Sequence, residues 1–369
     1  MSITIDDICT YAPKSGIKAG EATKDGQYMF FTSSEDESKR YTDYLYDGEG
    51  IIMGTGGNAT LHYYHGKYAV STDCIVLRPD DRIRCKYLYY FFLANMSILE
   101  AGFKGAGLKH TNKKYIGSIS IPKRPSIDVQ DRVIVVLDKV IGIIKSRKHE
   151  IDALDDLIKA RFVEMFGDML INPKGLPEKR LDSLANIVSG ITKGRKAKTD
   201  ELYEVPYMAV SNVKDGYIDW TTVKTIMATA GEIDQYRLLP DDVLMTEGGD
   251  PDKLGRGAII HEPPQDCIHQ NHIFRVRLMK NVLLSVYMAQ YLQQQKAKRY
   301  FLGCAKQTTG IASINMRQLS ALPVLVPPMK EQEDYAAFVT QVDKSKIVVQ
   351  KALDEAQLLF DSLMQQYFG

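Results

Sequence analysis

Two stretches of the chain carry apolar residues at spacings of three or four positions, or of seven, which is their sum. The first has them at Val133, Leu137, Val140, Ile144, Ile151, Leu154, Ile158 and Met165. The second has them at Phe338, Val342, Val349, Leu353, Ala356, Phe360 and Leu363. This spacing is typical of long helices that pack through an apolar seam. Each stretch follows a proline and ends at a glycine, so the pattern predicts two helices of about 40 residues, or about 60 Å at 1.5 Å per residue.

The two helical stretches are copies of each other. Residues 125–167 align with residues 327–369 without a gap, and Gln332 lies 202 positions after Gln130. The likeness continues upstream, where "GLKHTNKKYI" at 107 answers "GIASINMRQL" at 310 and "GEGIIMGTGGN" at 48 answers "PDDVLMTEGGD" at 240. The chain is therefore a tandem duplication in which each globular part is followed by one long helix.

Short runs between these helices predict the fold class. Runs such as "EGIIMG", "YAVSTDCIVL", "DDVLMT" and "HIFRVRL" are typical of strands, and "CKYLYYFFLANMSILEAG" is typical of an amphipathic helix. We expect an α+β fold with two pseudo-symmetric mixed α/β domains at 1–125 and 168–327, separated by helical repeats at 126–167 and 328–369.

The two long helices should pair, because an apolar stripe of that length needs a partner. A short link from 168 to 180 leads directly into the second globular part, which favours an antiparallel coiled coil. Two separate core helices remain the alternative.

Composition narrows the class of protein. The 369 residues are 44% hydrophobic, which is enough apolar material for two or three folded domains. Their net charge of +1 excludes a strongly cationic protein that coats nucleic acid without discrimination. No run reaches about 18 apolar residues and the start lacks a basic secretory signal, so we expect a cytoplasmic protein without a membrane segment. The five cysteines are scattered and form no CxxC pair, which argues against disulfides and zinc.

One loop, "LMTEGGDPDKLGRG" at 244–257, raises the question of catalysis. It contains no GxxxxGK followed by Ser or Thr, so it is not a phosphate cradle of that kind. Asp241 and Glu247 are candidate acids of a metal-dependent nuclease, but two glycines follow Glu247 in place of a lysine that would complete such a site, and Thr55 replaces Glu247 in the first copy. HExxH and GxSxG motifs are absent, and "EPPQ" at 262 does not supply the Asn-Pro-Pro-aromatic motif of an adenine methyltransferase.

Basic residues and glycines recur at equivalent places and are candidates for DNA contact, because cations attract phosphates and glycines allow a close backbone approach. In the first copy the candidates are Gly56, Gly57, Asn58, Lys104, Lys109, His110 and Lys113. In the second they are Lys193, Arg195, Gly248, Gly249, Lys253, Arg256, Lys306 and Gln307. Four of these side chains could reach base edges: Asn58, His110, Arg256 and Gln307.

The order of these phrases over essentially the whole chain resembles the specificity subunit of type I restriction–modification systems. The phrases that carry the resemblance include "YLYDGEGIIMGTGGNATLHYYHGKYAVST", "GLKHTNKKYIGSISIPKRP", "DVLMTEGGDPDKLGRGAI" and "SINMRQLSALPVLVPPMKEQ". The resemblance implies two target-recognition domains and two coiled-coil repeats, with no catalysis and no cofactor of their own.

The same resemblance implies the partners. They are double-stranded DNA with a bipartite asymmetric target and an unread spacer, two adenine methyltransferase subunits, and restriction or translocase subunits in the full complex. Two other functions stay open from the residues alone. One is a stand-alone metal-dependent nuclease that uses Asp241 and Glu247, and the other is a coiled-coil scaffold that does not bind DNA.

Overall fold

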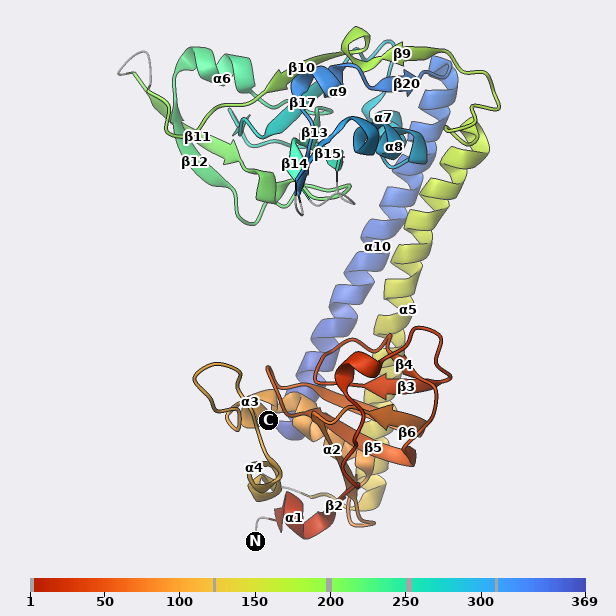
Figure 1. Ribbon diagram of the computed structural model, residues 1–369, viewed down its shortest axis with the longest axis vertical. Helices are drawn as coiled ribbons and strands as arrows, with labels where there is room; N and C mark the ends of the chain where they lie inside the picture. Colours follow the sequence, from red (N-terminus) through yellow and green to blue (C-terminus); the bar gives the residue numbers. More distant parts are fainter. Residues whose placement is uncertain (1–2, 122–123, 197–200, 250–253, 309–310) are drawn as a thin grey trace. The chain divides into compact units, whose positions relative to one another are not determined.

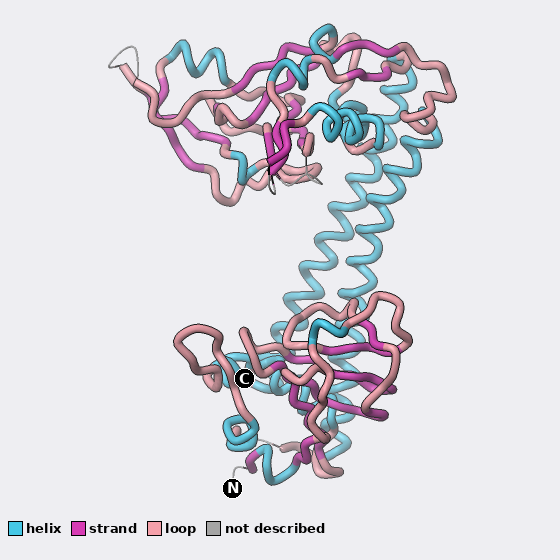
Figure 2. The backbone as a smooth tube through the Cα atoms, in the orientation of Figure 1, coloured by secondary structure: helices cyan, strands magenta, loops and turns pink. Residues whose placement is uncertain are grey.

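The chain divides into two compact units that share the two long helices. The structure is a computed structural model that describes residues 3–121, 124–196, 201–249, 254–308 and 311–369. Unit 1 comprises Met1–His149 and Val349–Gly369, and unit 2 comprises Glu150–Val348. Figure 1 labels the helices and strands, and Figure 2 shows how strands and helices alternate within each unit.

A six-stranded sheet forms the centre of unit 1, in the order β2-β7-β5-β6-β3-β4. All neighbours are antiparallel except β3 and β6. The strands are β2 Cys9–Tyr11, β3 Tyr28–Phe31, β4 Arg40–Tyr41, β5 Tyr46–Gly54, β6 Leu61–Val70 and β7 Cys74–Pro79, and β1 Ile3–Thr4 pairs separately with β8 Ser120–Ile121. The short helices are α1 Ile5–Ile8, α2 Cys85–Ala94, α3 Met96–Glu100 and α4 Lys113–Ser118, with a 3-10 turn at Ala19–Glu21.

Unit 2 repeats this plan with a smaller central sheet. The antiparallel order is β10-β17-β13-β15, formed by Ala185–Ser189, Ile273–Leu278, Val243–Thr246 and Gly257–Ile259. One three-stranded sheet consists of β12 Lys224–Ala228, β11 Tyr203–Met208 and β16 Ile268–His269. A second consists of β14 Gly248–Gly249, β19 Ile311–Ser313 and β18 Lys306–Thr308. A two-stranded sheet pairs β20 Pro323–Leu325 with β9 Glu178–Arg180. The helices are α6 Ala230–Tyr236, α7 Ser285–Leu292, α8 Gln295–Cys304 and α9 Met316–Ser320, with 3-10 turns at Leu181–Ser183 and Val210–Asn212.

Two 40-residue helices, α5 Ile127–Phe166 and α10 Met329–Phe368, contribute to the cores of both units. In unit 1 the early α5 residue Leu137 shares a core with the late α10 residue Met364. In unit 2 the late α5 residue Phe162 shares a core with the early α10 residue Tyr335. This order confirms the predicted antiparallel pair and the mixed α and β fold class. Within the described ranges, no helix is long and apolar enough to cross a membrane.

The last aromatic residue of each long helix packs in the unit in which the other long helix begins. The Phe368 ring lies 5.0 Å from Tyr87 in unit 1, and the Phe166 ring lies 5.0 Å from Tyr287 in unit 2. Phe166 and Phe368 are 202 residues apart, so the two contacts are equivalent in the repeat. Each unit therefore completes its core with the end of the helix that begins in the other unit.

Replacing Phe166 by alanine should destabilise unit 2 by about 3–5 kcal/mol, because Phe166 is fully buried and leaves a cavity among aromatic rings. Phe368→Ala is the matched control in unit 1. It should cost less, since Phe368 is only partly buried. Urea unfolding of both variants measures the difference, and an equal loss of unfolding free energy would contradict this account of the two cores.

Candidate nucleic-acid interface

The glycine doublet of unit 1 follows the end of β5 and is held by backbone hydrogen bonds. The Thr55 amide donates to the Asp73 carbonyl at 2.8 Å, and the Gly57 amide donates to the Lys109 carbonyl at 2.9 Å. Gly57 has φ +83°, a left-handed conformation that favours glycine. A Cβ on Gly56 would lie 3.3 Å from the His110 ring. The doublet therefore lies directly against the segment that contains Lys109 and His110.

That segment is a narrow hairpin. The amides of Lys104 and His110 donate to each other's carbonyls at 2.9 and 3.0 Å. Gly105 has φ +148°, and a Cβ there would approach the Leu108 carbonyl to 2.8 Å, so the turn requires glycine. Lys104, Lys109, His110 and the neighbouring Asn58 are all exposed. The structure thus brings together the glycine doublet and the candidate contact residues Lys104, Lys109 and His110 that the sequence predicted separately.

Unit 2 contains the same hydrogen-bond arrangement. The Glu247 amide donates to the His272 carbonyl at 2.9 Å, and the Glu247 carbonyl accepts from the Ile314 amide at 2.9 Å. In unit 1 the Thr55 carbonyl accepts from the Thr111 amide at 3.0 Å in the same way. Gly248 pairs with Ser313 in strands β14 and β19, as Gly56 bridges to His110. We call the doublet together with its hairpin the glycine element of each unit; it comprises residues 55–58 with 104–111 and residues 247–249 with 306–314, apart from positions outside the described residues.

The other strand of the unit 2 hairpin carries two of the predicted contacts. Lys306 pairs with Ser313 as Lys104 bridges to His110, and Gln307 stands opposite Ala312 in the backbone register. Lys306 is exposed. The side chain of Gln307 and all of Lys253 lie outside the described residues.

The charge of the glycine element differs between the units. In the part of the chain that the structure describes, exposed Lys104 and Lys109 form no ion pair, so their charge is available to a ligand. Lys113 follows in α4, and its Nζ lies 4.9 Å from the centre of the Tyr11 ring. At the positions equivalent to Lys109, His110 and Lys113, unit 2 has the uncharged residues Ala312, Ser313 and Met316.

Three further predicted residues lie elsewhere in unit 2. Arg195 forms a two-pronged ion pair with Glu232 of α6, at 2.7 and 2.5 Å, and this hydrogen bonding lowers the pKa of Glu232 to about 2. Arg195 therefore braces its loop against α6, while Lys193 on the same loop is exposed. The structure does not bring these two residues into contact with the glycine element. Arg256 borders the element through its carbonyl, which accepts from the Thr246 amide at 3.3 Å.

The two candidate nuclease acids flank β13 at opposite ends. Asp241 pairs with Lys280 at 2.5 Å, and Glu247 pairs with His272 at 2.6 Å. Among the described residues, no group of three or more His, Cys, Asp or Glu side chains is placed to hold a metal ion. These positions therefore offer no shared site to a metal-dependent nuclease.

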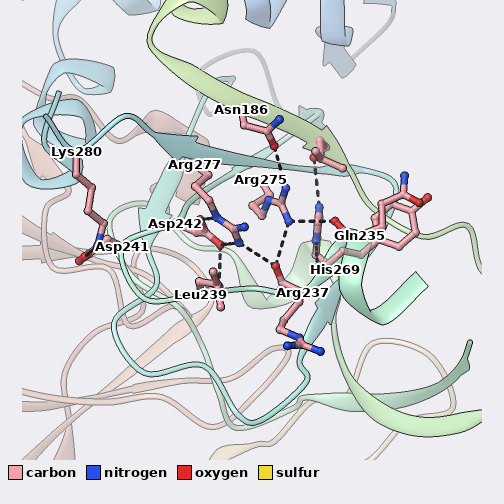
Figure 3. Close-up of polar contacts among 12 residues, drawn as sticks. Asn186, Gln235, Arg237, Leu239, Asp241, Asp242, His269, Arg275, Arg277 and Lys280 are labelled. Carbon is pink, nitrogen blue, oxygen red and sulfur yellow. Dashed lines mark hydrogen bonds and ion pairs between the residues drawn. The ribbon is translucent and has the colours of Figure 1, made fainter. Parts of the chain in front are cut away.

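A buried polar network behind β13 escaped the sequence prediction (Figure 3). Asp242 is 1% exposed and accepts two hydrogen bonds of 2.8 Å from Arg277. Arg275 is 4% exposed and donates to the carbonyls of Gln235 and Arg237, both at 3.1 Å. The alternation in "IFRVRL" places both arginines on one face of β17. The network ties residues 235–242 to the central sheet of unit 2. Strand β13 of that sheet leads directly into the glycine element.

His269 lies in the same network without a charged partner. Its Nδ1 is 3.0 Å from the Tyr236 carbonyl and its Nε2 is 3.3 Å from the Val188 carbonyl. Burial lowers the pKa of His269 to about 4, and the nearby Arg275 acts in the same direction. The imidazole is therefore neutral at pH 7 and serves the packing of unit 2.

Comparison with known proteins gives the class to which this architecture belongs. Residues 1–155 and 173–356 match the family described as "Type I restriction modification DNA specificity domain". Because the match covers most of the chain, the protein belongs to this family. Specificity subunits are the non-catalytic components of such systems, which confirms the expectation that the chain is not an enzyme.

Individual proteins agree with the family assignment. The chain is 22% identical over 308 residues to the type I restriction enzyme EcoKI specificity subunit of Escherichia coli (strain K12), a match that covers 79% of this chain and 66%, just under two thirds, of that protein. A solved type I restriction–modification S subunit from M. genitalium superimposes with a TM-score of 0.62 at 16% identity, covering 100% of this chain and 96% of that one. A second structure, from work on "complex assembly" and "conformational transition of the type I R-M system", gives 0.54 at 15% identity and covers 100% and 97%.

Acid should destabilise unit 2 through His269. An unfolded histidine titrates near pH 6.5, whereas folded His269 titrates near 4, so between these values only the unfolded chain binds the proton. Unfolding free energy should therefore fall as pH drops from 6.5 to 4, by on the order of 3 kcal/mol at about 1.4 kcal/mol per pH unit. Urea unfolding at several pH values measures this loss. The variant His269→Gln removes the titrating group, and an identical pH dependence in both proteins would contradict the assignment.

Proposed function

We propose that the chain is the DNA-reading subunit of a type I restriction–modification complex and that each unit reads one part of a bipartite, asymmetric target. Residues 1–125 and 168–327 act as the two target-recognition domains. The observation that carries this proposal is the repeated glycine element, in which the same backbone hydrogen bonds join a glycine doublet to a hairpin in both units.

The chemistry of the glycine element suits a DNA duplex. Exposed Lys104 and Lys109 attract phosphates, and a glycine surface lets the backbone approach the duplex closely. The element has no side chain at its glycines that would keep the backbone away from the duplex; these glycines are Gly56, Gly57, Gly248 and Gly249. Exposed Asn58 and His110 have hydrogen-bonding groups that can meet base edges, and Arg256 and Gln307 have the corresponding role in the second unit. Lys113, Lys193, Lys253 and Lys306 add phosphate contacts, while Arg195 supports the loop of Lys193.

The asymmetry of the target follows from the side chains of the two elements. Their backbone hydrogen bonds are equivalent, but Thr55 is replaced by Glu247 and His110 by Ser313. Base recognition depends on side-chain donors and acceptors, so two different sets of side chains read two different sequences. The bases between the two parts then form the unread spacer.

The long helices provide the docking surface for the partner subunits. Leu157 of α5 in unit 2 is 47% exposed, and Leu359 of α10 in unit 1 is 50% exposed. These two leucines are 202 residues apart and are therefore equivalent in the repeat. Apolar residues exposed at repeated positions suit two copies of one partner, namely two adenine methyltransferase subunits, with restriction or translocase subunits joining in the full complex. A structural neighbour from work on complex assembly of a type I R-M system supports assembly with other subunits.

Removing two cations of the unit 1 hairpin region should weaken binding to many DNA sequences alike. Replacing Lys109 and Lys113 with alanine in the reconstituted methyltransferase complex should flatten the plot of log affinity against log salt by up to about one unit per lost phosphate contact. Fluorescence anisotropy at several salt concentrations measures the slope. Lys24→Ala with Lys139→Ala, two exposed lysines outside the glycine element, is the matched control. If the two double variants have equal slopes, the DNA surface lies elsewhere.

Lengthening both helices should lengthen the spacer. Four residues inserted between Arg147 and Lys148, and four more at the equivalent position between Val349 and Gln350, add about 6 Å of helix. At about 3.4 Å per base pair, the spacer should grow by one or two base pairs while both half-site sequences stay the same. Genome-wide mapping of methylated adenine in a host with the variant tests this. A changed half-site at the original spacing would show that the helices do not set the distance.

A further inference from the structure

A buried glutamine ties the start of α5 to the globular part of unit 1. Gln130 is fully buried. Its Oε1 accepts from the Arg84 amide at 2.8 Å, at the start of α2. Its Nε2 donates to the Pro125 carbonyl at 2.9 Å and to the Arg82 carbonyl at 3.5 Å. One side chain thus joins the long helix, the segment before it and the start of α2.

Gln332 makes the same set of bonds at the start of α10 in unit 2. It is fully buried, and its Oε1 accepts from the Leu284 amide at 2.9 Å. Its Nε2 donates to the Pro327 carbonyl at 2.9 Å and to the Val282 carbonyl at 3.1 Å. Gln332 follows Gln130 by 202 residues. A buried side-chain amide whose hydrogen bonds are all satisfied fixes the orientation of the helix start relative to the recognition unit. Rotation of the helix relative to that unit would leave buried polar groups unpaired.

Unit 1 has further polar ties between α2 and α5. Arg84 forms a two-pronged ion pair with Asp131 at 2.8 and 2.9 Å. Asp138 accepts from the Lys86 ammonium at 2.7 Å and from the Tyr90 hydroxyl. Gln130 therefore shares the task of orienting unit 1 with two ionic contacts and a buried tyrosine.

Unit 2 lacks these ties at the equivalent positions. Leu284 and Val286 replace Arg84 and Lys86, and Thr340 lies 202 residues after Asp138. Among the described side chains, none from α7 bonds to α10, and only Gln332 joins the two helices. The two tyrosines at 89 and 90 become alanine and glutamine, and a cavity of about 860 Å³ opens there. Its lining includes Ile158, Val286, Ala289, Gln290, Gln293 and Val339.

We propose that Gln332 is a positioning residue that fixes the orientation of the unit 2 recognition part on α10 and thereby fixes the spacer length, whereas Gln130 shares this task in unit 1 with the polar ties of Arg84, Lys86 and Tyr90. The inference rests on the proposed function, since it assumes a two-part target. Successive base pairs are about 3.4 Å apart, so a displacement of that size in one unit changes the accepted spacing by one base pair. The half-site sequences do not change, because neither glutamine belongs to a glycine element.

Spacer length in mapped methylation sites is the measurement that separates positioning from stability. In a host that carries the methyltransferase subunit, the complex with the Gln332→Ala variant should methylate sites with the original spacer. It should also methylate sites whose spacer is about one base pair shorter or longer. Gln130→Ala, the matched control, should keep a single spacer because the ties of Arg84, Lys86 and Tyr90 remain. A general loss of stability would lower methylation at all sites without adding new spacings.

A rescue variant completes the test. Gln290→Tyr with Thr340→Asp introduces into unit 2 the residue pair equivalent to Tyr90 and Asp138 of unit 1, and it should restore the single spacer in the Gln332→Ala background. If Gln332→Ala does not fold, Gln332→Glu takes its place, since it keeps the acceptor for the Leu284 amide and loses the donor. A single unchanged spacer in a folded Gln332 variant would overturn the inference. Absence of any two-part motif with the wild-type chain would instead overturn the proposed function.

Discussion

The exchange of helix ends between the two copies is the constraint on which the rest of the structure depends. Each long helix starts at one unit and ends in the core of the other, where Phe166 packs on Tyr287 and Phe368 packs on Tyr87. Neither copy of the repeat therefore contains a complete core, and burial of these aromatic rings requires the antiparallel pair. The seam of the helices and the cores of the units are stabilised by the same apolar side chains.

Under the proposed function, equivalent backbones with different side chains would let one fold read two sequences. The glycine elements keep the same backbone bonds in both units, since the Thr55 and Glu247 carbonyls accept from the hairpin amides of Thr111 and Ile314. Because the backbone carries the geometry, the side chains are free to differ. Unit 1 presents Lys109 and His110, whereas unit 2 presents uncharged residues at these places. The duplication preserves the backbone of the glycine element, while its exposed side chains differ between the units.

The sequence predicted those features that depend on periodicity or repetition. Apolar residues spaced at three and four gave both helices, and the alignment paired the doublet at Gly56 with the one at Gly248. Long-range contacts could not be predicted from the sequence, because no local pattern indicates that the Gly57 amide donates to the Lys109 carbonyl. The role of Arg195 was missed for the same reason, since its partner Glu232 lies 37 residues away. Gln130 and Gln332 marked the repeat in the sequence, but only the structure shows that their amides are buried and fully bonded.

The central claim is that one chain reads two different short sequences at a fixed separation. Its most direct test is genome-wide mapping of methylated adenine in a host that has the methyltransferase subunit, with and without this chain. The account predicts that a single asymmetric motif in two parts, separated by a constant number of unspecified bases, appears only when the chain is present. An unbroken motif, or a methylation pattern that does not depend on the chain, would contradict it.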